Sequence, residues 1–81
     1  MNAVELTEFL VKNLVKEPDM VSVKQLVDED DVVVIQVLVD SSDMGAVIGR
    51  SGNIAKAIRV LVGASTYATS QKRVRIDIDS F

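Results

Sequence analysis

The residues best suited to binding a ligand are two glycines three positions apart with a basic residue between them. They form the segment Gly49-Arg50-Ser51-Gly52, which Asn53 and Lys56 follow. Glycine has no Cβ atom, so the backbone at both positions can come close to a phosphate. Arg50 adds a charge and Ser51 a hydroxyl donor. Lys56 adds a second charge about one helical turn further on. This pattern favours a clamp for the backbone of a polyanion.

Two predicted helices hold this loop between them. Ser42 or Asp43 can cap a short helix over Met44–Ile48, and Ser51 or Asn53 can cap a longer one that runs to about Ala68. The N-terminus of the longer helix directs its free N–H groups and positive dipole end towards the loop. We expect this helix to bury one apolar stripe: Ile54, Ile58, Leu61 and Ser65, supported by Ala57 and Val62.

The remaining elements predict an α+β domain. Ala3–Glu17 has apolar residues at helical spacing, and Pro18 ends it. Val21–Val27 and Val32–Val39 are predicted strands that pair as an antiparallel hairpin. Val74–Ile78 alternates cleanly and follows the two helices, so it is expected to pair in parallel with Val32–Val39. The expected order is α-β-β-α-α-β, a three-stranded sheet with the helices packed on one face.

Composition bounds the function. The 81 residues suit a single domain spanning 1–81, with no linker or repeat. The chain contains no Cys and no His, which excludes disulfides, thiolate catalysis, Ser-His catalysis and a conventional zinc site. Asp28–Asp31 lacks the spacing and glycine of a calcium loop, and the glycine pair lacks the Gly-Lys-Ser/Thr of a Walker loop. We therefore expect no enzyme activity, no metal, no cofactor and no small-molecule substrate.

The charge is divided unevenly along the chain. Net charge is −3, yet the first 43 residues hold ten acids and three bases, and residues 44–76 hold six bases and no acid. Such a division can present a basic face to a polyanion, although solvated surface charge gives the same pattern. No apolar run is long enough to span a membrane, and the first residues do not look like a signal segment. We expect a cytoplasmic location and no membrane partner.

A G-x-x-G between two helices, inside a β-α-α-β frame, resembles the KH domain, which binds single-stranded RNA. The preceding α-β pair is similar to the type II variant. The resemblance covers a minimal core at about 32–78 and an extension at about 3–27. It implies that the following residues contact RNA: Gly49, Arg50, Ser51 and Gly52 on the sugar-phosphate backbone, Ile48 and Ile54 in the apolar floor, Asn53 and Lys56 beside the loop, and Arg73 and Arg75 on the far rim.

A single type II KH domain of this length resembles the KhpA family of small bacterial RNA-binding proteins. That resemblance implies an RNA chaperone or post-transcriptional regulator that works as a homodimer or with a KhpB/Jag/EloR-like partner. It also implies a role in cell elongation, division and cell-wall homeostasis. The net acidity and the uncharged Asn53 depart from the family's pattern. The alternative is a KH-fold adaptor whose partner supplies most of the RNA binding.

The long helix offers a candidate interface. Its small apolar residues lie beside the core stripe and widen the apolar arc beyond what one sheet face covers. We expect a homodimer or partner contact through Ala57, Val60, Leu61 and Ala64. Two alternatives stay open: these residues are scattered surface apolar residues, or the contact uses the outer face of the sheet, with Val32, Val34 and Leu38.

Overall fold

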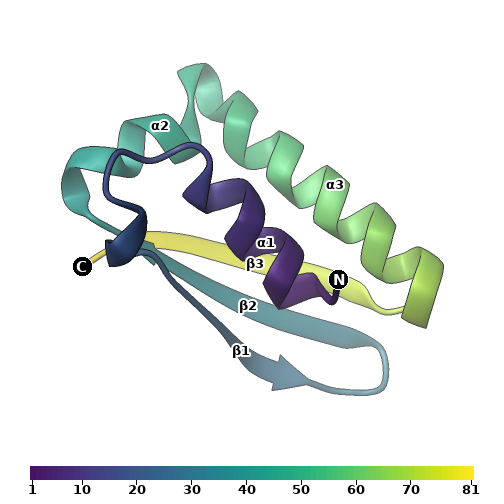
Figure 1. The fold of residues 1–81 in the computed structure, drawn as a ribbon. Helices are drawn as coiled ribbons and strands as arrows, with labels where there is room; N and C mark the ends of the chain where they lie inside the picture. The colour runs from purple at the N-terminus through teal and green to yellow at the C-terminus, as the bar shows by residue number, and fades with distance from the viewer.

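The computed structural model describes residues 1–81, and it confirms the predicted element order (Figure 1). Short 3₁₀ turns at residues 18–20, 41–43 and 50–52 join some of these elements. The helices and strands are α1 (Ala3–Lys12), β1 (Ser22–Asp28), β2 (Val32–Val39), α2 (Met44–Ile48), α3 (Asn53–Ser70) and β3 (Arg73–Ser80).

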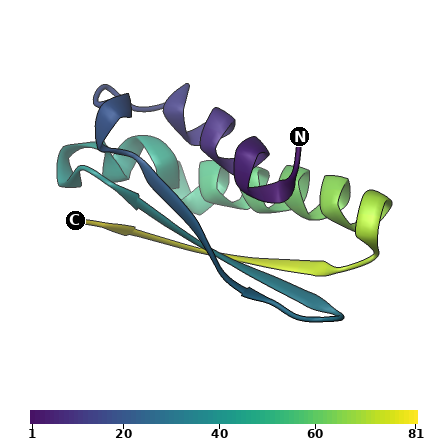
Figure 2. The same cartoon turned by 60° about the horizontal axis from the view of Figure 1, so that its bottom comes forward.

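The three strands form one sheet in the order β1-β2-β3, with β2 in the centre. β1 pairs with β2 antiparallel and β3 pairs with β2 in parallel, as the sequence predicts. All three helices cover one face of this sheet, and the other face carries no helix (Figure 2). The result is a two-layer α+β domain, in which β3 is the edge strand that lies beside α3.

The core lies between β2 and the helices. Alternate residues of β2 are buried, because successive side chains of a strand point to opposite faces of the sheet. On β3 the predicted alternation is also confirmed: Val74, Ile76 and Ile78 face the helices and the charged residues between them face outwards. The buried cluster consists of Val11, Val33, Ile35, Val37, Val39, Val47, Ile58, Val62 and Ile76.

The first helix is shorter than predicted. It ends at Lys12, not near Glu17. The segment that follows leaves the helix to meet Asp43, whose two carboxylate oxygens accept the backbone N–H groups of Lys16 and Glu17 at 3.1 Å each. Asp43 is 1% exposed, so this buried acceptor fastens the end of the N-terminal segment beside the start of α2.

The buried stripe of α3 is also displaced from the prediction. Ala55, Ile58, Val62 and Thr66 are buried, whereas Leu61 is exposed. Small side chains at 55 and 66 let the helix lie close to the sheet, and this turns the larger Leu61 outwards. The predicted stripe was Ile54, Ile58, Leu61 and Ser65. In its second half, the residues that are buried lie one position later in the sequence than predicted.

No helix of this chain combines the length and the apolar character that a membrane crossing requires.

Candidate nucleic-acid interface

The loop between α2 and α3 is built from backbone conformations that favour glycine. Gly49 and Gly52 have φ angles of 76° and 75°, and Ser51 lies in the left-handed region at 56°. A Cβ atom on Gly49 would lie 2.3 Å from Cγ1 of Ile54, whereas one on Gly52 would meet nothing within 4 Å. Gly49 is thus required for space as well as for conformation, and Gly52 for conformation alone.

This loop leaves the N-terminus of α3 without a side-chain cap. The N-cap residue is Gly52, and no side chain accepts a hydrogen bond there. The expectation that Ser51 or Asn53 caps the helix was therefore wrong. Ser51 is held in a left-handed turn, and Asn53 is already the first helical residue, so neither stands at the N-cap. The positive end of the α3 dipole consequently faces the loop with no acidic residue in its first turn.

The cations near this terminus have no carboxylate partner. Arg50 and Lys56 are exposed and take part in none of the three ion pairs of the chain. Those pairs are Lys12–Glu8, Lys72–Asp28 and Arg75–Asp77. The loop therefore combines two unpaired positive charges with an uncapped helix N-terminus.

Two partly buried isoleucines flank the loop. Ile48 ends α2 and Ile54 lies in the first turn of α3, and both pack against the core cluster. Ile54 also lies directly against Gly49. Each isoleucine keeps part of its surface exposed beside the loop, so both the core role and the predicted apolar floor are compatible with their position.

Arg73 and Arg75 do not join these residues. Both lie on β3, at positions that pair with Val32 and Val34 and point to the sheet face without helices. Nε of Arg75 is 3.3 Å from the carboxylate of Asp77 on that same outer face. The structure brings the other predicted binding residues together around the loop and places these two arginines apart from them.

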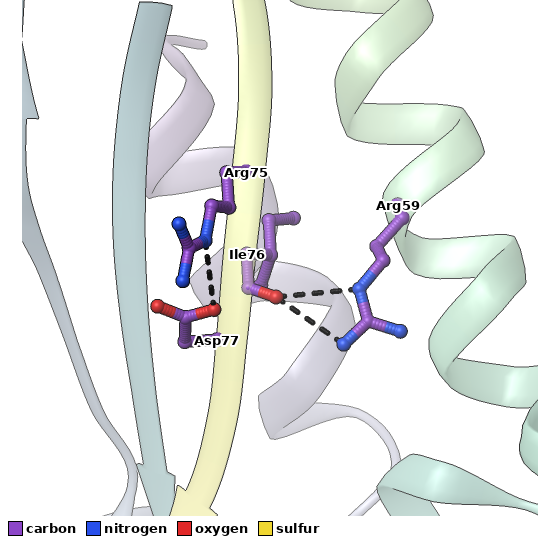
Figure 3. A network of polar contacts seen from close by, with 4 residues as sticks. All are labelled: Arg59, Arg75, Ile76 and Asp77. Carbon is purple, nitrogen blue, oxygen red and sulfur yellow. Dashed lines mark hydrogen bonds and ion pairs between the residues drawn. The ribbon is translucent and has the colours of Figure 1, made fainter.

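Arg59 is the residue whose position the sequence did not reveal. The wheel of α3 places it off the core stripe, which indicates a plain surface residue. In the structure its Nε and Nη2 both donate to the backbone oxygen of Ile76, at 3.3 and 3.2 Å (Figure 3). The only sequence signal was its place on the flank of the helix, three residues after Lys56.

The four residues of the predicted interface form a continuous exposed set on α3, which we name the α3 apolar surface. Val60 is 68% exposed and Leu61 is 54% exposed, and neither joins the core cluster. Their exposure leaves the surface available for a partner. The α3 apolar surface consists of Ala57, Val60, Leu61 and Ala64.

Comparison with solved structures identifies the fold. The chain matches Era from Aquifex aeolicus, bound to GDP and AlF4−, with a TM-score of 0.72, 18% identity and 98% of this chain covered. It also matches an Era structure in complex with MgGDPNP and nucleotides 1506–1542 of 16S ribosomal RNA, with a TM-score of 0.69, 20% identity and 96% coverage. The chain spans only 30% and 29% of those two proteins. The α-β-β-α-α-β order with a parallel β2–β3 pair is the type II KH fold.

Comparison with proteins and protein families gives the relationship. The RNA-binding protein KhpA of Borreliella burgdorferi is 40% identical over 77 residues, which cover 95% of this chain and 92% of that protein. The family model described as "KhpA/KhpB, KH domain" matches residues 4–78. Together with the glycine loop and the fold, these matches show that the chain belongs to the KhpA/KhpB family of KH-domain proteins.

Proposed function

We propose that this chain binds single-stranded RNA and that residues 49–52 hold the sugar-phosphate backbone. The observation that carries the proposal is the uncapped N-terminus of α3 beside the unpaired Arg50 and Lys56. Free N–H groups, a positive dipole end and two cations favour an anion at this place. The related Borreliella protein is named an RNA-binding protein, which supports RNA as the polyanion.

The bases of the bound strand lie over the partly exposed side chains of Ile48 and Ile54, next to the loop. Asn53 and Lys56 contribute a polar contact and a charge on the first turn of α3. A KH groove holds about four nucleotides, so a single copy reads little sequence. From its membership of the KhpA/KhpB family we propose the role of an RNA chaperone or post-transcriptional regulator, with a part in cell elongation, division and cell-wall homeostasis.

Two copies pair through the α3 apolar surface. Ala57 and Ala64 lie seven residues apart, on either side of Val60 and Leu61. In a two-fold contact the large residues of one copy meet the small residues of the other, so this pattern is self-complementary. Two linked loops raise the affinity for one RNA strand without new contacts.

The RNA proposal is tested by fluorescence anisotropy with a labelled single strand of about eight uridines, twice the length that one KH loop clamps. We expect the Arg50→Asp/Ser51→Asp variant to bind about a hundred-fold more weakly, because it loses two charge-assisted or polar contacts and adds repulsion. Affinity of the wild type should fall as salt rises.

A matched control carries the same change of charge elsewhere. Lys24→Glu/Gln25→Glu alters two exposed residues of β1 and should bind almost as well as the wild type. If both double variants lose affinity equally, the loop is not the binding site. If the wild type itself does not bind, the adaptor alternative replaces the proposal, and RNA binding belongs to a KhpB/Jag/EloR-like partner.

The dimer is tested by light scattering after size-exclusion chromatography. Leu61→Glu should halve the measured mass, whereas Leu26→Glu should not, although both leucines are 54% exposed. An unchanged mass for Leu61→Glu would exclude the α3 apolar surface as the homodimer contact. A monomeric wild type that gains mass only with a KhpB/Jag/EloR-like protein would make the heterodimer the working form.

A further inference from the structure

The free edge of β3 carries one backbone carbonyl that is already occupied by a side chain of the protein. N–H groups of Arg73 and Phe81 donate to Asp31 and Val39 on the β2 side. Because the backbone groups of successive strand residues point to alternate sides, residues 74, 76, 78 and 80 direct theirs to the free edge. The carbonyl of Ile76 is one of these, and Arg59 holds it from α3 (Figure 3).

This contact fixes the guanidinium of Arg59 in one orientation. Ile76 is 2% exposed and pairs with Ile35 of the central strand, so its backbone is held by the sheet and by the core. The guanidinium is planar and carries five N–H groups in a rigid fork. Nε and Nη2 each direct one N–H to the carbonyl, which leaves the Nη1/Nη2 edge free with two parallel donors. Arg59 belongs to none of the chain's ion pairs.

The occupied carbonyl also decides which ligand the edge accepts. A peptide that adds to a sheet edge needs the edge carbonyls as acceptors, and Arg59 blocks the one at Ile76. The N–H of Ile76 lies on the same edge, beside the guanidinium. The edge therefore presents donors at this point, which suits a ligand with neighbouring acceptors and disfavours a docking strand.

We infer that Arg59 is a base-reading residue of the RNA site, and that it selects a base with two adjacent hydrogen-bond acceptors. Guanine offers O6 and N7, and cytosine offers O2 and N3; adenine sets an amino donor beside each acceptor on its outer edges. Arg59 lies seven residues after Gly52, about 10 Å along α3, within the length of the strand that a KH loop clamps. The inference rests on the proposed RNA binding and adds the base that it prefers.

The test uses wild-type protein and labelled RNAs of about eight uridines whose two central positions carry guanine, cytosine or adenine. We expect guanine or cytosine to bind about ten-fold more tightly than adenine, the discrimination of one good bidentate contact. A 7-deazaguanine strand distinguishes the two sources, because it removes only the N7 acceptor. Tight binding of the guanine strand that is lost with 7-deazaguanine identifies guanine read through O6 and N7, and tight binding of the cytosine strand alone identifies cytosine.

Arg59→Lys keeps the charge and removes the planar fork. We expect it to lose the preference for guanine or cytosine over adenine, measured as the ratio of the two affinities of the same variant. Lys24→Gln, on the outer face of β1, is the control and should keep the preference. An unchanged preference in Arg59→Lys, or equal binding of all strands by the wild type, would overturn the inference and leave RNA binding intact. Failure of every strand to bind would instead overturn the proposed function and this inference with it.

Discussion

The two long helices of this domain begin in opposite ways. At the start of α1 the side chain of Asn2 accepts the N–H of Glu5 at 2.8 Å, and the Glu5 carboxylate accepts the N–H of Asn2 at 3.1 Å. This reciprocal capping box satisfies two backbone donors and places a negative charge on the dipole end. α3 starts at Gly52, with no side-chain cap and no acid in its first turn.

The difference indicates what each terminus is for. In this chain the N-terminus of α1 is closed by side chains of the protein, including a carboxylate. The N-terminus of α3 has no such cap, and cations lie near it. Capping groups at α3 would satisfy the same N–H groups that an outside anion would use. The closed end therefore contributes to stability, and the open end is expected to contribute to binding. Substitutions at the open end, at the closed end and at two other hydrogen-bonded carboxylates test this division.

The largest effect is expected at Gly49. Gly49→Ala sets a Cβ 2.3 Å from Ile54 Cγ1 at a φ of 76°, so the free energy of unfolding should fall by about 3 kcal/mol. Gly52→Ala meets no neighbour within 4 Å and should cost about 1 kcal/mol, from its φ alone. Urea unfolding of both variants measures the two values. Equal losses would show that the close approach of Ile54 does not restrict the side chain at position 49.

A smaller effect is expected at Asp43. Asp43→Ala removes the buried acceptor of two backbone N–H groups, and the free energy of unfolding should fall by about 2 kcal/mol. Asp43→Asn keeps one acceptor oxygen and should lose about half as much. Urea unfolding of the pair checks this order. If Asp43→Ala is as stable as the wild type, the N-terminal segment is not held against α2 by this carboxylate.

Opening the closed helix end should change stability and not binding. Asn2→Ala breaks the capping box, so the protein should lose about 1 kcal/mol of unfolding free energy while its RNA affinity stays the same. The loop variant Arg50→Asp/Ser51→Asp should show the reverse. Thermal unfolding and anisotropy on the same samples measure both. A loss of RNA affinity in Asn2→Ala would end the distinction between the two helix ends.

The smallest effect is expected at the carboxylate of Asp40, and it depends on pH. The hydroxyl and then the backbone N–H of Ser42 donate to Asp40, and both lower the pKa of this carboxyl below its usual value. A lowered pKa in the folded state means that the contact stabilises the protein above about pH 4, the unfolded value, and that this is lost as pH falls through the folded value.

Asp40→Asn should therefore be slightly less stable than the wild type at neutral pH, and the difference should shrink in acid. Urea unfolding of both proteins at neutral pH and near pH 3 measures it. A difference that grows in acid would show that the contact between Asp40 and Ser42 favours the protonated carboxyl.

Local patterns were enough to predict most of the fold. The β-branched run of Val32–Val39, the alternation in Val74–Ile78 and the crossover between them predict the sheet and its parallel pair, which the structure confirms. The loop was predicted because glycine and charge mark it directly. Each of these features depends on residues that are neighbours in sequence.

Features that depend on contacts between distant segments were predicted poorly. The face of α3 that is buried depends on the packing of Ala55 and Thr66 against the sheet. A helical wheel contains no information on this packing, and it therefore placed Leu61 in the core. The segment after α1 is held by Asp43, which lies more than 25 residues away from its partners Lys16 and Glu17. The contact of Arg59 with Ile76 depends on how α3 is placed along β3, and the periodicity of the sequence does not give that placement.

The parallel pairing of β2 and β3 has a consequence for how the chain is made. β2 is the sequence VVVIQVLV, and its second edge is covered only when residues 73–80 arrive after two helices and a loop. During synthesis the hairpin of β1 and β2 can form early, but a long, β-branched edge without charges stays open until then. Such an edge is prone to pair with other chains. Release of an incomplete chain that stops at the end of α3 should therefore yield aggregates, whereas a chain that continues through the end of β3 at Ser80 should yield a folded domain.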